Sequence, residues 1–135
     1  MKLEKIIKRF RVDKPDKFRL ADVDPADVVG DTVDLERGVI RELTEETGLT
    51  LADVAPQPGW TATPFGQRIA LMKIMESRED ADALRARIVA DLACQPAPEL
   101  SDIHIVRSLD DLDARMPPYV RAYLAAALAN RRRTA

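Results

Sequence analysis

The stretch that most constrains how this chain folds is residues 41–49, Arg-Glu-Leu-Thr-Glu-Glu-Thr-Gly-Leu. In a helix, Glu42, Glu45 and Glu46 are neighbours, because positions three and four apart lie side by side on the helix surface. Like charges at this spacing weaken a helix by about 0.2–0.5 kcal/mol per pair. The cluster therefore indicates either a solvated acidic helix end or a site for a hard divalent cation, which prefers carboxylate oxygens.

The flanking residues predict the limits of this helix. Thr32 or Asp34 can cap its N-terminus with a side-chain oxygen, and Gly48 suits the left-handed residue that ends many helices. An apolar stripe at four-residue spacing is expected to face the core: Leu35, Val39 and Leu43. The three glutamates point elsewhere, so they are expected at the edge of the packed helix.

This stretch resembles the second half of the Nudix box, G-x5-E-x7-R-E-U-x-E-E-x-G-U, in which U is a bulky aliphatic residue. The matching residues are Arg41, Glu42, Leu43, Glu45, Glu46, Gly48 and Leu49. The first half of the box departs from the pattern, because Val33 stands at the glutamate position and Asp27 at the glycine position. A shifted turn at residues 30–32 would restore the glycine only with a different loop length. The chain thus resembles a Nudix hydrolase with a divergent front half of the box.

The resemblance implies an α+β fold, the Nudix-like α/β/α sandwich, with an incomplete or atypical N-terminal part of the sheet. It also implies Mg²⁺- or Mn²⁺-dependent hydrolysis of a diphosphate linkage. By that resemblance Glu45 and Glu46 are metal ligands, Glu42 is a ligand or a base for the attacking water, and Arg41 supports the carboxylates. A metal ion at such a site clamps the diphosphate and neutralises charge as the bond breaks.

Other residues are weaker candidates for the same site. A later carboxylate often completes such a site, and the sequence does not choose among Glu76, Glu99 and Asp102. Trp60 and Phe65 are candidates to stack on a nucleobase, or they simply fill the core. His104, which is the chain's single histidine, is a candidate ligand or base, but a lone histidine on a strand is more often structural or exposed.

Residues 1–30 form a separate segment in this interpretation, and residues 31–135 form the Nudix-like domain. Residues 1–10 have helical apolar spacing and predict a short amphipathic helix. Residues 10–27 resemble the leader of type-2 polyphosphate kinases, but the chain lacks the G-x-x-x-x-G-K-[ST] loop, so kinase activity is not expected. Lys14, Lys17 and Arg19 either bind an anion such as polyphosphate or RNA, or are solvated surface charges.

The rest of the chain predicts a regular succession of elements. These are a buried strand at 68–75, a helix that opens at 77–80 and ends before 95, a strand at 102–107, a short helical turn at 108–113 and a last helix from 117. Together with the box helix they make a core that is reasonable for one domain of this length.

Composition narrows the class of protein. The net charge of −2 argues against bulk attraction to nucleic acid or membrane. The single cysteine, Cys94, excludes an internal disulfide framework and fits a reducing compartment. Because no apolar run has transmembrane length and the first residues lack the apolar segment of a signal peptide, the expected location is the cytoplasm.

Three functions follow from these patterns. The first is a divergent metal-dependent pyrophosphohydrolase that acts on a nucleoside-diphosphate-linked small molecule. The second is a catalytically inactive Nudix-like fragment that serves as a binding or interaction module. An incomplete sheet would leave an open edge, and pairing of that edge would produce a homodimer. The third is anion binding through the basic N-terminal arm.

Overall fold

We describe the fold from a computed structural model, which describes residues 2–14, 17–20 and 25–134 and the side chains of residues 25–133. Within these residues the chain is a mixed α+β protein with three α-helices and two antiparallel sheets. The α+β class expected from the sequence is therefore confirmed.

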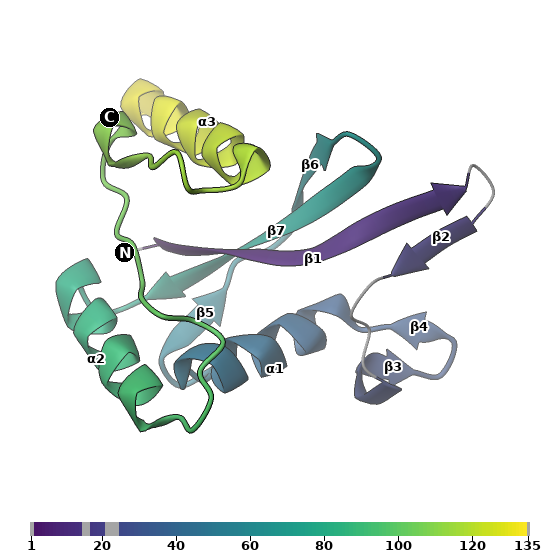
Figure 1. Cartoon of the computed structure of the whole chain (residues 1–135), viewed down its shortest axis with the longest axis horizontal. Helices are drawn as coiled ribbons and strands as arrows, with labels where there is room; N and C mark the ends of the chain where they lie inside the picture. Colours follow the sequence, from purple (N-terminus) through teal and green to yellow (C-terminus); the bar gives the residue numbers. More distant parts are fainter. Residues whose placement is uncertain (1, 15–16, 21–24, 135) are drawn as a thin grey trace.

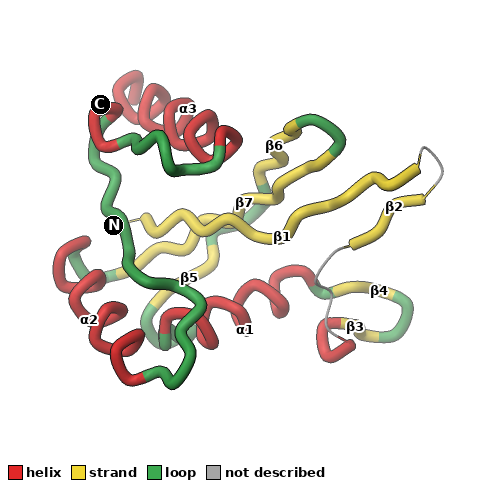
Figure 2. The backbone as a smooth tube through the Cα atoms, viewed as in Figure 1, coloured by secondary structure: helices red, strands yellow, loops and turns green. Residues whose placement is uncertain are grey.

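The main sheet is built around one long central strand, β7 (Arg68–Ser77) (Figure 2). The strands that join it are β1 (Lys2–Lys14), β2 (Lys17–Leu20), β5 (Val54–Pro56) and β6 (Thr61–Phe65). The order is β2-β1-β7-β5, with β6 also paired to β7, and every pairing is antiparallel. The mostly apolar sequence of β7 suits a strand with neighbours on both edges, so the strand predicted at 68–75 is confirmed.

The second sheet is a small hairpin of β3 (Val28–Val29) and β4 (Thr32–Val33). Gly30 lies in its turn at φ 61°, a left-handed conformation that favours glycine. Val33, at the glutamate position of the box pattern, is half-buried in β4. Gly30, the candidate for a shifted glycine of the box pattern, therefore lies in the turn of the hairpin.

The three helices are α1 (Leu35–Thr47), α2 (Ala81–Cys94) and α3 (Pro118–Thr134), and short 3₁₀ turns occur at η1 (Pro25–Asp27) and η2 (Leu109–Asp111). Of the two candidate N-caps for the box helix, Asp34 is the one used, because its side chain accepts the N–H of Arg37 at 2.9 Å. Asp80 caps α2 in the same way through the N–H of Ala83. The helices and the helical turn predicted after residue 76 are confirmed.

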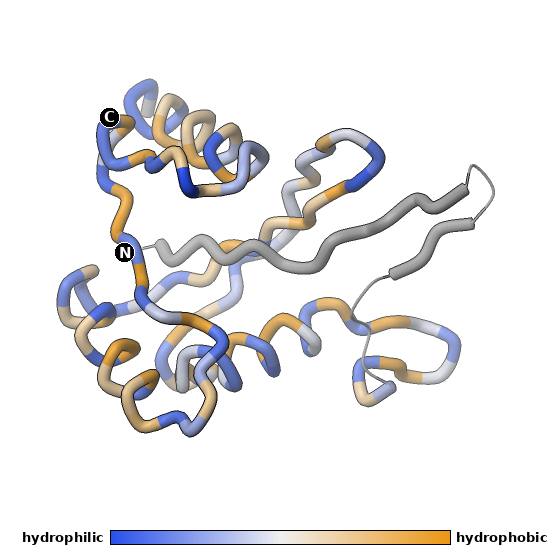
Figure 3. Tube along the Cα trace, viewed as in Figure 1, coloured by the Kyte–Doolittle hydropathy of each residue, from blue (hydrophilic) through white to orange (hydrophobic). Residues whose placement is uncertain are grey.

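Two hydrophobic cores lie on opposite faces of the sheet, as the helix positions in Figure 1 show. The α1–α2 core consists of Val39, Leu43, Leu49, Val54, Met75, Leu84, Ile88 and Leu92. The α3 core consists of Ala70, Met72, Tyr119, Val120 and Tyr123. β7 supplies both cores because successive side chains of a strand point to opposite faces. Hydrophobic and hydrophilic residues alternate along α1 and α3 in Figure 3, as expected for helices with one buried face.

Two elements predicted from local sequence were wrong. The helix predicted over residues 1–10 is part of β1, which pairs with β7 from Lys2↔Glu76 to Arg11↔Arg68. This long pairing outweighs the helical spacing of a few apolar residues. The strand predicted at 102–107 is irregular, because its ends bond to side chains: the N–H of Ile103 to Asp102 and the N–H of Arg107 to Asp111.

The β1–β7 pairing also joins residues 1–30 and residues 31–135 in one sheet. The segment that resembles a kinase leader therefore supplies two strands, β1 and β2, to the sheet on which the helices pack. Among the described residues, no helix has the length and apolar character that crossing a membrane requires.

Candidate functional site

The C-terminal half of α1, which carries the box-like residues, ends at a tightly packed glycine. Gly48 has φ 71°, and its N–H donates to the carbonyl of Thr44 at 2.9 Å. A Cβ at this position would lie 2.6 Å from Cγ of Asp91 on α2. Glycine therefore suits the left-handed conformation, and it leaves room for the carboxylate of Asp91.

Arg41 is the centre of the polar network on this helix. Its Nη2 lies 3.0 Å from Oδ2 of Asp27, and its Nη1 lies 3.2 Å from Oε2 of Glu45. The Oε1 atom of Glu42 is 3.9 Å from Nη2. The hydrogen bond to Asp27, and then the nearby negative charges of Asp27 and Glu45, raise the pKa of Arg41 well above its usual range, against the lowering effect of burial. Arg41 thus holds carboxylates from two separate parts of the chain together.

Asp27 is the residue of this network that sequence analysis did not identify as a partner. It stands where the box pattern has glycine, and it is only 1% exposed. Its backbone carbonyl accepts the N–H of Asp34 at 2.7 Å, so the residue is tied to the start of α1. The sequence showed only a carboxylate in a turn with proline before the helix. It did not show that this carboxylate pairs with Arg41, because the fold brings the two residues together.

The two adjacent glutamates of the box pattern point in different directions. Glu45 has a side chain that is 60% exposed and pairs with Arg41. Glu46 is half-buried and lines a large cavity between α1, α2 and α3. Consecutive residues on a helix leave it about 100° apart, and Arg41 draws Glu45 further to one side. The pair is therefore split between the helix surface and the cavity wall.

The donor set can be tested for its fit to a divalent metal ion. Within the described residues, no three His, Cys, Asp or Glu side chains are grouped so that they could hold a metal. Mg²⁺ usually keeps several waters and binds one or two carboxylates together with substrate phosphates. Glu42 and Glu46 leave α1 on the same side, being four residues apart. Two carboxylates leave the rest of an ion's coordination shell to water and to substrate oxygens.

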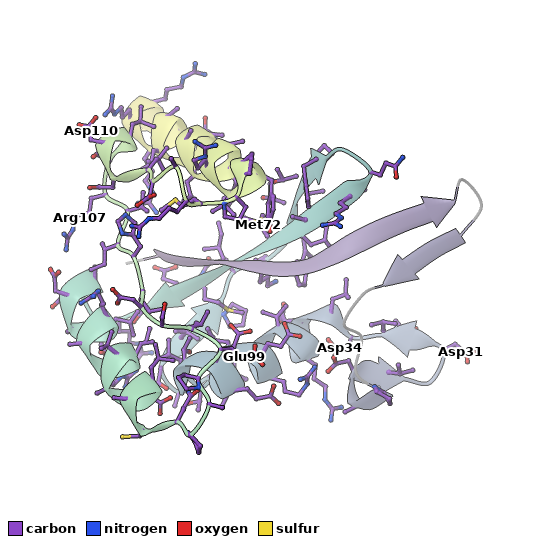
Figure 4. All side chains as sticks on the ribbon, in the orientation of Figure 1. Asp31, Asp34, Met72, Glu99, Arg107 and Asp110 are labelled. Carbon is purple, nitrogen blue, oxygen red and sulfur yellow. The ribbon has the colours of Figure 1, made fainter. Side chains whose placement is uncertain are left out.

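The three candidate completing carboxylates lie in different places. Glu76 is exposed on β7, and Glu99 is exposed in the loop after α2 (Figure 4). Asp102 lines the same cavity as Glu46, but its Oδ1 is 2.6 Å from Nη2 of Arg85. Of the three, Asp102 is the one that the fold brings to the cavity of a box glutamate.

The two aromatic candidates are not brought together. Trp60 packs against the α1–α2 core, with Nζ of Lys73 at 4.9 Å from its ring centre. Phe65 packs against the α3 core and stacks on Tyr119 with ring centres 4.1 Å apart. Their contacts are those of core residues on opposite faces of the sheet, and a role in substrate binding stays a prediction.

The remaining candidates are a histidine and the basic arm. His104 is exposed, and its Nε2 lies 2.7 Å from the carbonyl oxygen of Asp111, so it ties the loop to η2. The side chains of Lys14, Lys17 and Arg19 lie outside the described part of the chain. Anion binding by this arm stays a prediction.

Comparisons of the chain with protein-family models, curated proteins and solved structures gave no match.

Proposed function

We propose that the chain is a divergent hydrolase of the Nudix type, with a Nudix-like fold, that cleaves the diphosphate linkage of a nucleoside-diphosphate-linked small molecule. The observation that carries this proposal is the position of Arg41, which contacts Asp27, Glu45 and Glu42 from one helix. An arginine that holds several carboxylates in place is the support that a carboxylate-based phosphoryl site needs.

Within this proposal each residue has a distinct task. Glu42 and Glu46 bind Mg²⁺ or Mn²⁺ together with the substrate diphosphate, or Glu42 takes the proton of the attacking water. Arg41 keeps Glu42 and Glu45 oriented, and like any arginine it is positively charged at neutral pH. The bound ion supplies neutralisation of the charge that develops on the diphosphate. Glu45, the other ligand expected from the box pattern, is held by Arg41 on the exposed side of the helix.

The test is hydrolysis of a panel of nucleoside-diphosphate derivatives with and without Mg²⁺. We expect turnover that needs the metal and falls by about 10²-fold or more in Glu46→Gln. Asp110→Asn, which changes an exposed carboxylate away from α1, is the matched control. Equal turnover by the parent chain and Glu46→Gln rejects the assignment of Glu46.

Metal binding gives a second readout that does not depend on turnover. Because the protein offers two carboxylates, we expect Mn²⁺ to bind weakly to the protein alone and at least about tenfold more tightly with a non-hydrolysable nucleoside diphosphate present. Calorimetry with Glu42→Gln and Glu46→Gln measures each contribution. Unchanged Mn²⁺ binding in both variants excludes the proposed pair.

A second candidate function is a binding or interaction module without catalysis. The observation in its favour is that no three ligating side chains are grouped within the described residues. On this alternative the chain binds a diphosphate or a second copy of itself without turnover. Metal-independent diphosphate binding, with no hydrolysis of any compound in the panel, selects this alternative. Sedimentation over a range of protein concentrations tests for the homodimer.

A further inference from the structure

A cavity in the described part of the molecule has a volume of about 620 Å³. Cavities that bind small organic molecules usually measure about 300–1,000 Å³ and are mostly apolar. This one lies where α1, α2, α3 and the loop of residues 100–107 meet. Its buried walls are Leu43, Met72, Leu84, Ile88, Val120 and Tyr123. The apolar walls favour a ligand with a substantial hydrocarbon or aromatic body.

Arginines gather at the α3 side of this cavity. A smaller hollow of about 200 Å³ adjoins it, since Arg107 and Arg131 line both spaces, and Arg132 lines the smaller one. Figure 4 shows Arg107 between α2 and α3. We call Arg107, Arg131 and Arg132 the basic rim. Guanidinium groups at the edge of an apolar space are suited to a carboxylate or phosphate group.

The rim arginines Arg107 and Arg132 are exposed to a ligand anion. Arg107 pairs with Asp82 at 2.7 Å, but both side chains are well exposed, so the pair is weak and can be exchanged for a ligand anion. Asp102 on the cavity wall is already paired with Arg85. Arg132 is exposed and makes no ion pair among the described residues. Glu46 lies on the α1 side of the cavity, whereas the basic rim lies on the α3 side.

We propose that the cavity and its basic rim bind an anionic amphiphile, with the apolar body between the helices and a carboxylate or phosphate head group on Arg107, Arg131 and Arg132. This binding does not depend on the proposed hydrolysis, because the ligand is held by residues outside the box pattern, apart from the wall contributed by α1.

The experiment is a calorimetric titration of the full chain with dodecanoate, dodecyl phosphate, dodecanol and dodecyltrimethylammonium, each kept below its micelle concentration. We expect one molecule per chain and at least about fivefold tighter binding of an anion than of the alcohol. The two anions distinguish a carboxylate from a phosphate head group. Equal affinity for the alcohol and both anions overturns the assignment of the rim.

Matched variants distinguish binding in the cavity from binding elsewhere on the surface. Ala127 lines the cavity, whereas Ala126 is its exposed neighbour on α3. We expect Ala127→Phe to weaken binding about tenfold or more by filling the space, and Ala126→Phe to leave it unchanged. Equal effects of the two substitutions overturn the assignment of the cavity.

The rim is tested in the same way. Arg132→Gln should weaken the binding of both anions about fivefold and leave the binding of dodecanol unchanged. Arg133→Gln changes an exposed arginine outside both hollows, so it should leave every affinity unchanged. A further arm uses vesicles of phosphatidylglycerol. Binding to vesicles without binding to any monomeric amphiphile overturns the proposal in favour of a surface that recognises a membrane.

Discussion

At the scale of single residues, Asp27, which differs from the glycine of the box pattern, makes a structural contact with Arg41. A glycine would leave this position without a charge, but Asp27 is buried and pairs with Arg41, the residue that also contacts Glu45. Asp27 therefore connects the segment before α1 to the helix that carries the candidate site. The ion pair with Arg41 gives a structural reason for an aspartate at this position.

The contribution of this pair can be measured with Asp27→Asn. Removing one partner of a fully buried ion pair costs about 3–5 kcal/mol, and the partial exposure of Arg41 reduces the expected loss to about 2 kcal/mol. Urea unfolding measures the loss. Asp31→Asn, at an exposed position in the turn of the β3–β4 hairpin that follows, should change stability by less than about 0.5 kcal/mol. Equal effects of the two variants would contradict the role of Asp27.

Asp111 makes stability depend on pH. The backbone N–H groups of Arg107 and Ser108 donate to its carboxylate, and they lower its pKa from the ordinary value of 3.8. A carboxyl whose pKa is lower in the folded state stabilises the fold above about pH 4, and the contribution is lost as pH falls through the folded pKa.

Asp111→Asn resembles the protonated carboxyl, so it should lower the melting temperature at about pH 7 and have progressively less effect as pH falls toward about 2. Calorimetric melting across this range provides the measurement. Asp110→Asn, the exposed neighbour, should have no effect at either end. A difference between the parent chain and Asp111→Asn that stays constant with pH would refute the assignment.

At the scale of elements, one buried cation connects α1 to the central strand. Lys73 on β7 is 2% exposed, and its Nζ lies 2.6 Å from Oε2 of Glu36 and 3.3 Å from the carbonyl of Gly59. The same ammonium group lies over the ring of Trp60. The helix that carries the candidate site is thus oriented by an ion pair as well as by its apolar stripe.

This pair should respond asymmetrically to mutation. Glu36→Gln leaves a buried ammonium without its counter-ion and should cost about 2 kcal/mol, whereas Lys73→Met keeps the apolar stem and should cost less than about 1 kcal/mol. Glu36, whose side chain is 47% exposed, remains hydrated in the second variant. Urea unfolding of both variants ranks the losses, and the reverse order would contradict the argument.

At the scale of the whole molecule, the sheet separates two cores. The box helix and α2 cover one face, and α3 covers the other through Tyr119, Val120 and Tyr123. The stack of Phe65 on Tyr119 joins α3 to β6. The stability of α3 is therefore expected to be partly independent of the α1–α2 core.

Tyr119→Ala tests this division. Loss of a buried aromatic ring and its stack should cost about 3 kcal/mol, and Tyr119→Phe, which keeps the ring, should cost less than about 1 kcal/mol. Native-state hydrogen exchange should show faster exchange in α3 while the amides of α1 and α2 stay protected. Equal loss of protection in all three helices would show that the two cores unfold as one.

Much of the local structure was predictable from the sequence. The glycine that ends α1, the strand at 68–75 and the helices after it follow from periodicity and end signals, which act over a few residues. Of the apolar stripe predicted for α1, Val39 and Leu43 lie in the core, whereas Leu35 is only half-buried. The choice of Asp34 over Thr32 as the N-cap was left open by the sequence. The candidate glutamates share a helical turn because of their spacing. Their individual directions were not predictable, because Arg41 and the cavity wall that separate Glu45 from Glu46 come from the tertiary arrangement.

What only the tertiary structure decided depends on partners distant in sequence. Residues 2–14 form a strand because the distant strand β7 pairs with them. Residues 102–107 are a different case, because the side chains that take their backbone N–H groups, Asp102 and Asp111, are close in sequence. Asp27 meets Arg41, and a basic rim meets an apolar cavity, because the chain folds back on itself. The sequence alone indicated the limits of α2, the start of α3 and the C-terminal end of α1, since caps and periodicity are local. Pairing, burial and charge contacts were decided by the fold.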